Sequence, residues 1–300
     1  GNVIDKEAGI LSRGNLTRLK NFLNRAAQGE RLTVGFIGGS ITQGFAATEP
    51  DKCYAARTVA WLRKVFPNTE FDYVNAGIGA TNSQFGAARV QEDLLCRLPD
   101  LVMVEFSVND HCTPHDMETY EGLIRQIYGS RSCPAMVLLH SVYYDTGKSA
   151  AYYHAQIGRH YDLPCISMQN SIYPAVAAGR LPAEKITADF LHPNDLGHEF
   201  MASVITNFLE KVIHDKTQEQ QEIFPAPLTE NAYEHCARLQ YFNSTPGRSG
   251  FEEDMTPQRD ITDIFRNGWS AGEKGAYLEF TFRGTGAAVQ YRRVKDGPAP

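Results

Sequence analysis

The sequence predicts a three-layer α/β/α domain built on a five-stranded parallel sheet, followed by a small antiparallel β module. Three observations lead to this prediction. Short β-prone segments alternate with helical segments about five times, the β-prone segments are almost entirely apolar, and the alternation stops near residue 214. Strands that are apolar on both faces are typical of a parallel sheet covered by helices on each side. The predicted organisation is a main domain over 1–214, a linker over 215–227 and the module over 228–300.

A first helix is expected over 15–27, because apolar residues recur there at three- and four-residue steps behind Asn15, a suitable N-cap. The predicted strands are 33–37, 71–75, 101–106, 135–140 and, more weakly, 164–167. The predicted helices that follow them are 54–65, 83–95, 118–128, 150–161 and 195–212. In such a sheet, reactive residues gather just beyond the carboxyl ends of the strands, so the loops at that edge are the place to look for a site.

The chain changes character after residue 214. The segment His214–Pro227 is polar and ends in a proline-rich run, which predicts a linker. Beyond it, Leu278, Phe280 and Phe282 alternate with polar residues, as in a half-buried strand. Few clear strands precede residue 300, so we expect this module to be incomplete and the natural chain to continue.

Composition excludes several classes of protein. Lys plus Arg number 29 against 35 Asp plus Glu, a net charge of −6, which argues against nucleic acid or an anionic membrane as a partner bound by bulk charge. No apolar run approaches the ~20 residues of a membrane span. The six cysteines form no CxxC pair, which favours free thiols over a disulfide or zinc framework. Compartment, whether cytoplasmic or exported, and oligomeric state stay open.

A Gly-Ser segment, GGSITQG, follows the first predicted strand at Gly38–Gly44. Its glycines allow a sharp turn that presents Ser40 at the carboxyl end of the strand. The segment lacks the Lys-Ser/Thr of a P-loop, and Thr42 replaces the second glycine of a G-x-S-x-G elbow. It therefore predicts an exposed, positioned hydroxyl, although a turn without chemistry fits the segment equally well.

Two further loops lie at the same predicted edge: NAGIGATNS at Asn75–Ser83 and VEFSVND at Val104–Asp110. A glycine-rich loop can aim backbone N–H groups into a cleft, and Asn109 can add a side-chain amide, as an oxyanion hole requires. Ordinary turn formation by Gly and Asn explains either loop considered alone.

A carboxylate and an imidazole share one short segment, DFLHPNDLGH, at Asp189–His198. Asp189 and His192 are three residues apart, and Pro193 disfavours helix at His192, so both are expected in a loop. A histidine can accept the proton of a serine hydroxyl, and a carboxylate can fix its tautomer and stabilise the imidazolium. Five other histidines, at 154, 160, 198, 214 and 235, are expected to be surface or capping residues.

A metal site is not predicted, and neither is any other cofactor. His111 and His115 are four residues apart, but Pro114 between them disfavours the helix that would align them.

We expect four residues near Asn109 to line a substrate pocket. These are Gly39, His111, Tyr143 and Tyr144.

Taken together, GGSIT, NAGIGAT, VEFSVND and DFLHP, in this order, resemble the SGNH (GDSL-type) hydrolases, a group of serine esterases and lipases with a flavodoxin-like fold. The resemblance spans roughly residues 15–211. Residue by residue, it implies Ser40 as nucleophile, His192 as base and Asp189 as supporting acid. It also implies an oxyanion hole made by the N–H of Ser40, the N–H of Gly79 or Ala80, and the amide of Asn109.

Two departures from the family pattern bear on these assignments. The first block usually reads Gly-Asp-Ser, and Gly39 replaces the aspartate, a variant familiar among carbohydrate-directed relatives. The family glycine of the second block aligns with Ala80, so both Gly79 and Ala80 remain candidates for the backbone donor.

Relatives that act on acylated sugars often carry an appended β-sandwich, which the module after residue 227 resembles. The resemblance therefore implies a metal-independent serine esterase that removes short acyl groups, expected to be acetyl, from a small-molecule or glycan ester. One alternative is a lipase or thioesterase acting on longer acyl chains. Another is an inactive carbohydrate-binding protein. A nucleotide-binding flavodoxin-like domain ranks last, because it leaves the His192 segment unexplained.

Overall fold

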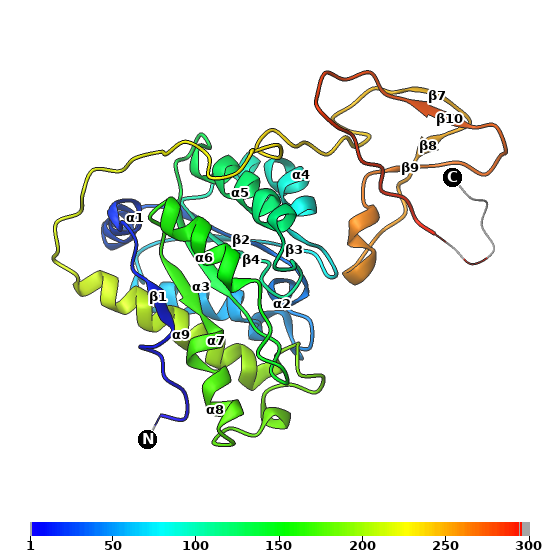
Figure 1. Cartoon of the computed structure of the whole chain (residues 1–300). Coiled ribbons are helices and arrows are strands. Elements are labelled where there is room, and N and C mark those ends of the chain that lie inside the picture. Colours follow the sequence, from blue (N-terminus) through cyan, green and yellow to red (C-terminus); the bar gives the residue numbers. More distant parts are fainter. Residues whose placement is uncertain (1, 294, 296–300) are drawn as a thin grey trace. The chain divides into compact units, whose positions relative to one another are not determined.

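The computed structural model describes residues 2–293 and 295, and the chain forms two compact units, Gly1–Cys236 and Ala237–Pro300 (Figure 1). The division falls at 236/237, whereas the sequence places the start of the module at 228. Residues 215–236 belong with the first unit, for reasons given below.

A six-stranded sheet forms the centre of the first unit, with strand order β1-β6-β5-β4-β2-β3. Its strands are β1 (Ile10–Ser12), β2 (Leu32–Gly38), β3 (Phe71–Gly77), β4 (Leu101–Glu105), β5 (Ala135–His140) and β6 (Cys165–Ser167). The five strands from β2 to β6 are parallel, which confirms the predicted fold class. The sequence did not predict β1, a three-residue antiparallel strand on the edge beside β6, because so short a strand has no recognisable period.

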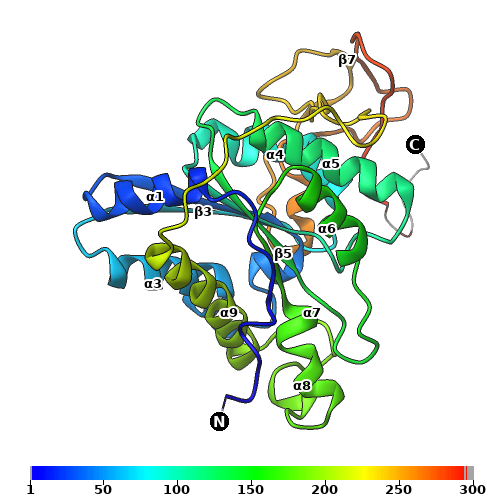
Figure 2. The ribbon, with the colours of Figure 1, turned by 60° about the vertical axis from the view of Figure 1, so that its left-hand side comes forward.

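Helices cover both faces of this sheet (Figure 2). On one face lie α1 (Thr17–Ala27), α3 (Tyr54–Val65) and α9 (Asp195–His214), and on the other lie α4 (Ser83–Asp93), α5 (Pro114–Tyr128) and α6 (Ala151–His160). Strand β4 shows why: Leu101 and Met103 pack into one hydrophobic cluster and Val102 and Val104 into the other. Helix α5 begins four residues before its predicted start, because the Thr113 side chain caps it and proline is tolerated in the first turn.

Short helices complete the first unit. They are α2 (Ser40–Gln43), α7 (Met168–Ser171), α8 (Tyr173–Ala177) and the 3₁₀ turns Pro50–Lys52, Leu95–Arg97 and Ala183–Lys185.

Residues 215–236, which we call the strap, run over the first unit and are held there by ion pairs. Arg13 contacts Asp215 at 3.0 Å and Glu219 at 2.6 Å, and Arg125 contacts Glu234 at 2.8 Å. The hydrogen bond from Arg13 is the main cause that lowers the pKa of Glu219 to about 2. The polar composition that predicts a free linker therefore belongs to a segment whose charges pair with distant side chains.

The second unit contains short antiparallel strands, as predicted. Strand β7 (Gly247–Ser249) pairs with β10 (Tyr277–Glu279), and β8 (Glu252–Glu253) pairs with β9 (Trp269–Ser270). The rings of Trp269 and Phe280 lie 5.4 Å apart and give this unit an aromatic contact. It also contains the 3₁₀ turn Asp260–Phe265.

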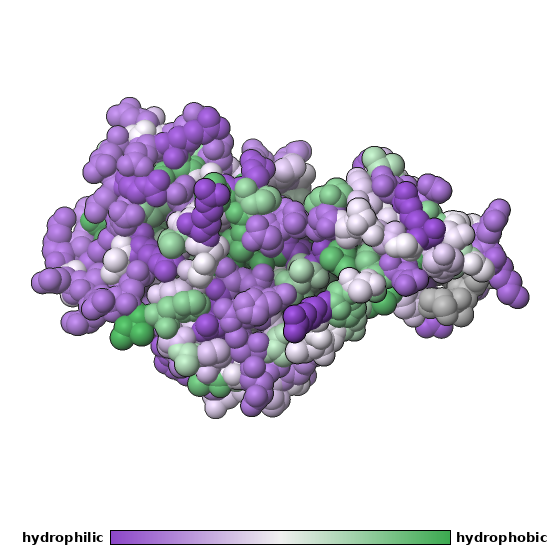
Figure 3. Space-filling view, turned by 90° about the horizontal axis from the view of Figure 1, so that it is seen from above, coloured by the Kyte–Doolittle hydropathy of each residue, from purple (hydrophilic) through white to green (hydrophobic). Residues whose placement is uncertain are grey.

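The apolar side chains that form the core are buried away from the surface. The face drawn in Figure 3 is mainly hydrophilic, with scattered apolar patches. Among residues 2–293 and 295, no helix has both the length and the apolar character needed to span a bilayer.

Candidate active site

Ser40 lies at the carboxyl edge of the sheet because β2 ends at Gly38 and a one-turn helix begins directly after Gly39. The backbone at Gly38 approaches its neighbours so closely that a Cβ there would lie 2.2 Å from Thr42 Oγ1 and 2.5 Å from the Glu105 carbonyl oxygen. The turn ends at Gly44, whose φ of +98° is in the left-handed region. Glycine is therefore needed on both sides of the serine for the hydroxyl to be presented here.

Ser40, His192 and Asp189 form a continuous chain of hydrogen bonds. Ser40 Oγ lies 2.9 Å from His192 Nε2, and His192 Nδ1 lies 2.6 Å from Asp189 Oδ2. An ionised carboxylate can only accept, so Nδ1 carries the proton and Nε2 has a free lone pair for the serine O–H. This is the arrangement in which a histidine can deprotonate a serine.

Asp189 stays ionised although it is partly buried. Burial would raise its pKa, but hydrogen bonds from the His192 ring and from the N–H groups of His192 and Leu191 outweigh this effect and lower the pKa to about 2. The backbone donors lie 2.8 Å and 3.0 Å from Oδ1.

The loop that carries Asp189 and His192 is anchored at both ends. Phe190 adopts a left-handed φ of +62°, which costs free energy for a residue with a side chain, and its carbonyl accepts the Tyr144 N–H at 2.7 Å. On the other side, Asn194 caps α9 by accepting the Gly197 N–H at 3.1 Å.

Asn109 lies against the backbone that bears the serine. A Cβ added to Gly39 would come within 2.3 Å of Asn109 Oδ1. Glycine at position 39 therefore leaves the space that the Asn109 side chain fills in this structure.

The end of β3 and the loop after it are tied to the serine turn by three hydrogen bonds. Asn75 Nδ2 donates to the Thr42 carbonyl at 2.8 Å, the Ile78 N–H donates to the Gly38 carbonyl at 3.0 Å, and the Gly79 N–H donates to Gln43 Oε1 at 3.0 Å. The loop also lies beside Ser40, since a Cβ at Gly79 would be 3.7 Å from Ser40 Cβ.

This arrangement distinguishes the two candidate donors of the loop. The Gly79 N–H is already engaged by Gln43, whereas the Ala80 N–H has no hydrogen-bond partner within the described part of the chain. Ala80 also has a φ of +59°, the conformation that favours glycine, in agreement with its alignment to the family glycine.

Sequence reasoning missed the role of Asp110. Its buried carboxylate accepts the Ser83 N–H at 2.9 Å and contacts His154 Nε2 at 2.9 Å, which links the starts of α4 and α6 to the loop that carries Asn109. His154 is buried and stacks on Tyr120 at 3.6 Å, so the expectation of a surface or capping residue is wrong.

His198 is also buried, so the expectation of a surface position is wrong for it, but its ring does cap α3 by accepting the first N–H of that helix. The Tyr54 N–H donates to His198 Nδ1 at 3.1 Å, so the ring proton is on Nε2, which donates to the Phe45 carbonyl at 3.3 Å. Burial lowers the pKa of His198 to about 4 and keeps it neutral.

The expected pocket residues differ in exposure. His111 is exposed, and Tyr143 is half-buried with its hydroxyl 3.2 Å from the Val108 carbonyl. Tyr144 instead packs in the core and contributes only its backbone N–H near the site, because the chain turns inward after β5.

His111 and His115 do not share a helix, since α5 begins at Pro114, and His115 Nε2 contacts Gln84 at 3.1 Å. Throughout residues 2–293 and 295, no three His, Cys, Asp or Glu side chains gather to hold a metal.

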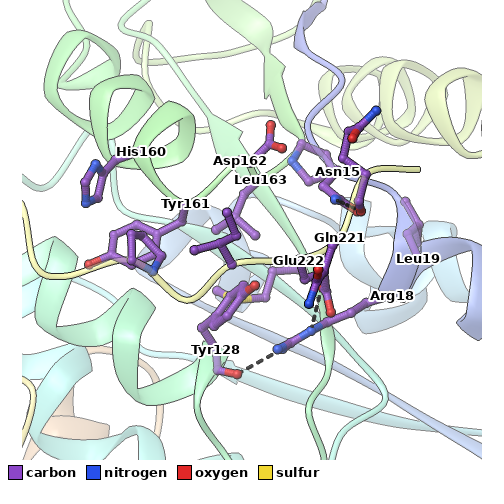
Figure 4. A pocket seen from close by; sticks show the side chains of 15 residues that line it. Asn15, Arg18, Leu19, Tyr128, His160, Tyr161, Asp162, Leu163, Gln221 and Glu222 are labelled. Carbon is purple, nitrogen blue, oxygen red and sulfur yellow. Dashed lines mark hydrogen bonds and ion pairs between the residues drawn. The ribbon is translucent and has the colours of Figure 1, made fainter. Parts of the chain in front are cut away.

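A cavity of about 320 Å³ lies under the strap, between α1 and the ends of α5 and α6 (Figure 4). Met136 at the start of β5 and Pro164 before β6 line it, so it is at the opposite end of the sheet from Ser40. Within its lining, Arg18 contacts Glu222 at 3.0 Å and donates to the Tyr128 carbonyl at 2.9 Å. This hollow is separate from the candidate active site.

Comparison with known proteins identifies the family of the chain. The GDSL-like lipase/acylhydrolase family model matches residues 36–200. A solved two-domain esterase active on acetylated mannans is 52% identical, with a TM-score of 0.86, covering 91% of this chain and 74% of that one. The same esterase co-crystallised with mannopentaose is 51% identical, with a TM-score of 0.84, covering 91% and 73% of the two chains.

An acetylxylan esterase from Geobacillus stearothermophilus is more distant, with 20% identity, a TM-score of 0.49, and coverage of 59% of this chain and 94% of that one. No curated protein matches the chain.

Proposed function

The chain belongs to the GDSL-like lipase/acylhydrolase family and is a carboxylic ester hydrolase, and from that premise we propose that it removes acetyl groups from an acetylated mannan or a closely related glycan. The observation that carries the proposal is the hydrogen-bond chain from Ser40 through His192 to Asp189. The substrate class rests on the 52% identical esterase, which is active on acetylated mannans.

In the first half of the reaction, His192 Nε2 takes the proton of Ser40 Oγ while Oγ attacks the carbonyl carbon of the ester. The carbonyl electron pair moves onto its oxygen. When this tetrahedral intermediate collapses, the bond to the sugar oxygen breaks, and that oxygen takes the proton from His192. The ionised Asp189 stabilises the imidazolium between these two transfers.

We assign the oxyanion hole to the N–H groups of Ser40 and Ala80 and to the side-chain amide of Asn109. The Gly79 N–H is less suited, because it donates to Gln43. Gln43 then acts as a positioning residue that holds the loop so that the following N–H faces the oxyanion. One such donor is worth about 3 kcal/mol in the transition state.

In the second half, water attacks the acetyl-serine. His192 again accepts the proton, now from water, and returns it to Ser40 Oγ as acetate leaves. Every proton transfer in the cycle is assigned to His192, so the proposal requires no metal.

The test is acetate release from acetylated glycans and from acetyl and octanoyl p-nitrophenyl esters, by the wild type and by Ser40→Ala. We expect the wild type to prefer acetyl esters and to deacetylate mannan fragments, and the variant to lose nearly all turnover and all labelling by a fluorophosphonate. Preference for octanoyl esters would indicate a lipase instead. Glycan binding without any ester turnover would indicate an inactive binding protein.

A further inference from the structure

Phe45 is an exposed aromatic residue in direct contact with the proposed base. Phe45 is 55% exposed to solvent. Its ring centroid lies 4.5 Å from that of His192, at an interplanar angle of 60°. Nothing in the proposed proton transfers uses this ring. An apolar ring held open to solvent beside a reacting group is typical of a ligand-binding surface.

The backbone holds this ring in a fixed place. The Phe45 N–H donates to the Ser40 carbonyl at 3.0 Å, and the Phe45 carbonyl accepts from the buried, neutral His198 at 3.3 Å. The ring is therefore presented by the same turn that presents the nucleophile, so the two keep a constant spacing.

The chemistry determines which part of the substrate meets this ring. His192 must protonate the departing sugar oxygen, so the alcohol lies on the His192 side of Ser40. The carbonyl oxygen must point the other way, toward Asn109, which lies against Gly39. A ring in contact with His192 therefore borders the alcohol rather than the acyl group.

We propose that Phe45 is a specificity-determining residue whose exposed face binds the C–H face of the pyranose ring that carries the acetyl group. This inference rests on the proposed function and adds to it a binding contact for the sugar. A pyranose ring presents several C–H groups on one face, which pack against the electron-rich face of an aromatic ring. Contacts of this kind with an aromatic ring contribute on the order of a tenfold change in an equilibrium constant.

The experiment compares Phe45→Leu and Phe45→Trp with the wild type on acetylated mannooligosaccharides and on ethyl acetate. Leucine keeps the apolar bulk but has no planar face, whereas tryptophan keeps the face. Ethyl acetate delivers the same acetyl group from an alcohol without a ring. We expect Phe45→Leu to lower kcat/KM about tenfold on the glycan, mainly through KM, and less than about threefold on ethyl acetate. Phe45→Trp should keep glycan activity.

Equal losses on both substrates, or a displaced pH profile in Phe45→Leu, would overturn the inference, because the ring would then act through His192. Wild-type enzyme that deacetylates the glycan no better than Phe45→Leu would also overturn it. A wild type that hydrolyses ethyl acetate but releases no acetate from any glycan would refute the proposed function, and this inference with it.

Discussion

Replacing Asp189 by asparagine tests the proposed triad most directly. The substitution is nearly isosteric, and Oδ1 can still accept the N–H groups of Leu191 and His192. It places an NH₂ group opposite His192 Nδ1, where the carboxylate oxygen now lies at 2.6 Å. An NH₂ group cannot accept a hydrogen bond, so the imidazole proton moves to Nε2, which faces Ser40 Oγ and can then no longer take its proton.

The expected magnitude follows from the exposure of the carboxylate. The Asp189 side chain is 49% exposed. Its attraction for the imidazolium therefore lies between about 1 kcal/mol and about 4 kcal/mol, the values for two unit charges about 4 Å apart in water and near a protein surface, respectively. This corresponds to a factor between about 5 and about 1,000 in rate. With the tautomer effect added, we expect kcat to fall about 100- to 1,000-fold, less than the ~10⁴-fold typical of a buried triad aspartate.

The assay is kcat and KM on an acetyl ester together with the melting temperature. Asp195→Asn is the matched control, since Asp195 is in the same segment but accepts its hydrogen bonds from Thr48. We expect the control to stay within about twofold of the wild-type kcat. If folded Asp189→Asn enzyme kept kcat within about threefold of the wild type, Asp189 would not orient His192 and the reasoning would fail.

Three further substitutions probe other parts of the first unit. Gln43→Met removes the acceptor of the Gly79 N–H, so kcat on an acetyl ester should fall about tenfold with KM little changed; a change in KM alone would contradict a positioning role. Burial raises the pKa of Glu105 above its ordinary 4.5, so the folded state holds a proton that the unfolded state releases, and stability falls as pH rises. As the pH rises above 4.5, Glu105→Gln should therefore gain melting temperature relative to the wild type, and a difference that does not change with pH would refute this. Glu219, with its pKa lowered to about 2 from 4.5 by Arg13, contributes stability above pH 4.5 that is lost as pH falls toward 2. Glu219→Gln should lower the free energy of unfolding by about 1 kcal/mol at pH 7 and leave it unchanged at pH 2, as measured by urea denaturation.

The sheet was predictable because its signal is local. Strand β4 is apolar on both faces, and its two faces pack into separate clusters, so a continuous apolar run was sufficient evidence. The strap was not predictable, because the residues that hold it are far away in sequence: Arg13 and Asp215 are 202 positions apart. A polar segment with distant partners has the same composition as a free linker.

The candidate site was likewise predictable only in part. The order of the four motifs was sufficient to nominate Ser40, His192 and Asp189, and the structure brings these three side chains within hydrogen-bond reach. Whether Gly79 or Ala80 offers a free N–H depended on the Gln43 side chain, whose contact with Gly79 is not encoded by residue spacing. The sequence therefore indicated the residue types, and packing decided which backbone group is free.

The contacts around the site separate the groups that must stay fixed from the group that must exchange protons. The loops that carry Ser40, Ala80 and Asn109 are tied to one another by the Ile78–Gly38 hydrogen bond and by the close packing of Gly39 on Asn109. Stabilising an oxyanion needs dipoles that are already oriented before charge develops, and such mutual bracing provides them. The His192 loop contacts this assembly through the Ser40–His192 hydrogen bond and is held from the loop after β5 by the Tyr144 N–H. Its carboxylate is half exposed. In the proposed reaction His192 serves both Ser40 Oγ and the departing oxygen. Displacement of Ala80 or Asn109 would weaken the proposed oxyanion hole, because its donors would no longer point at the developing charge.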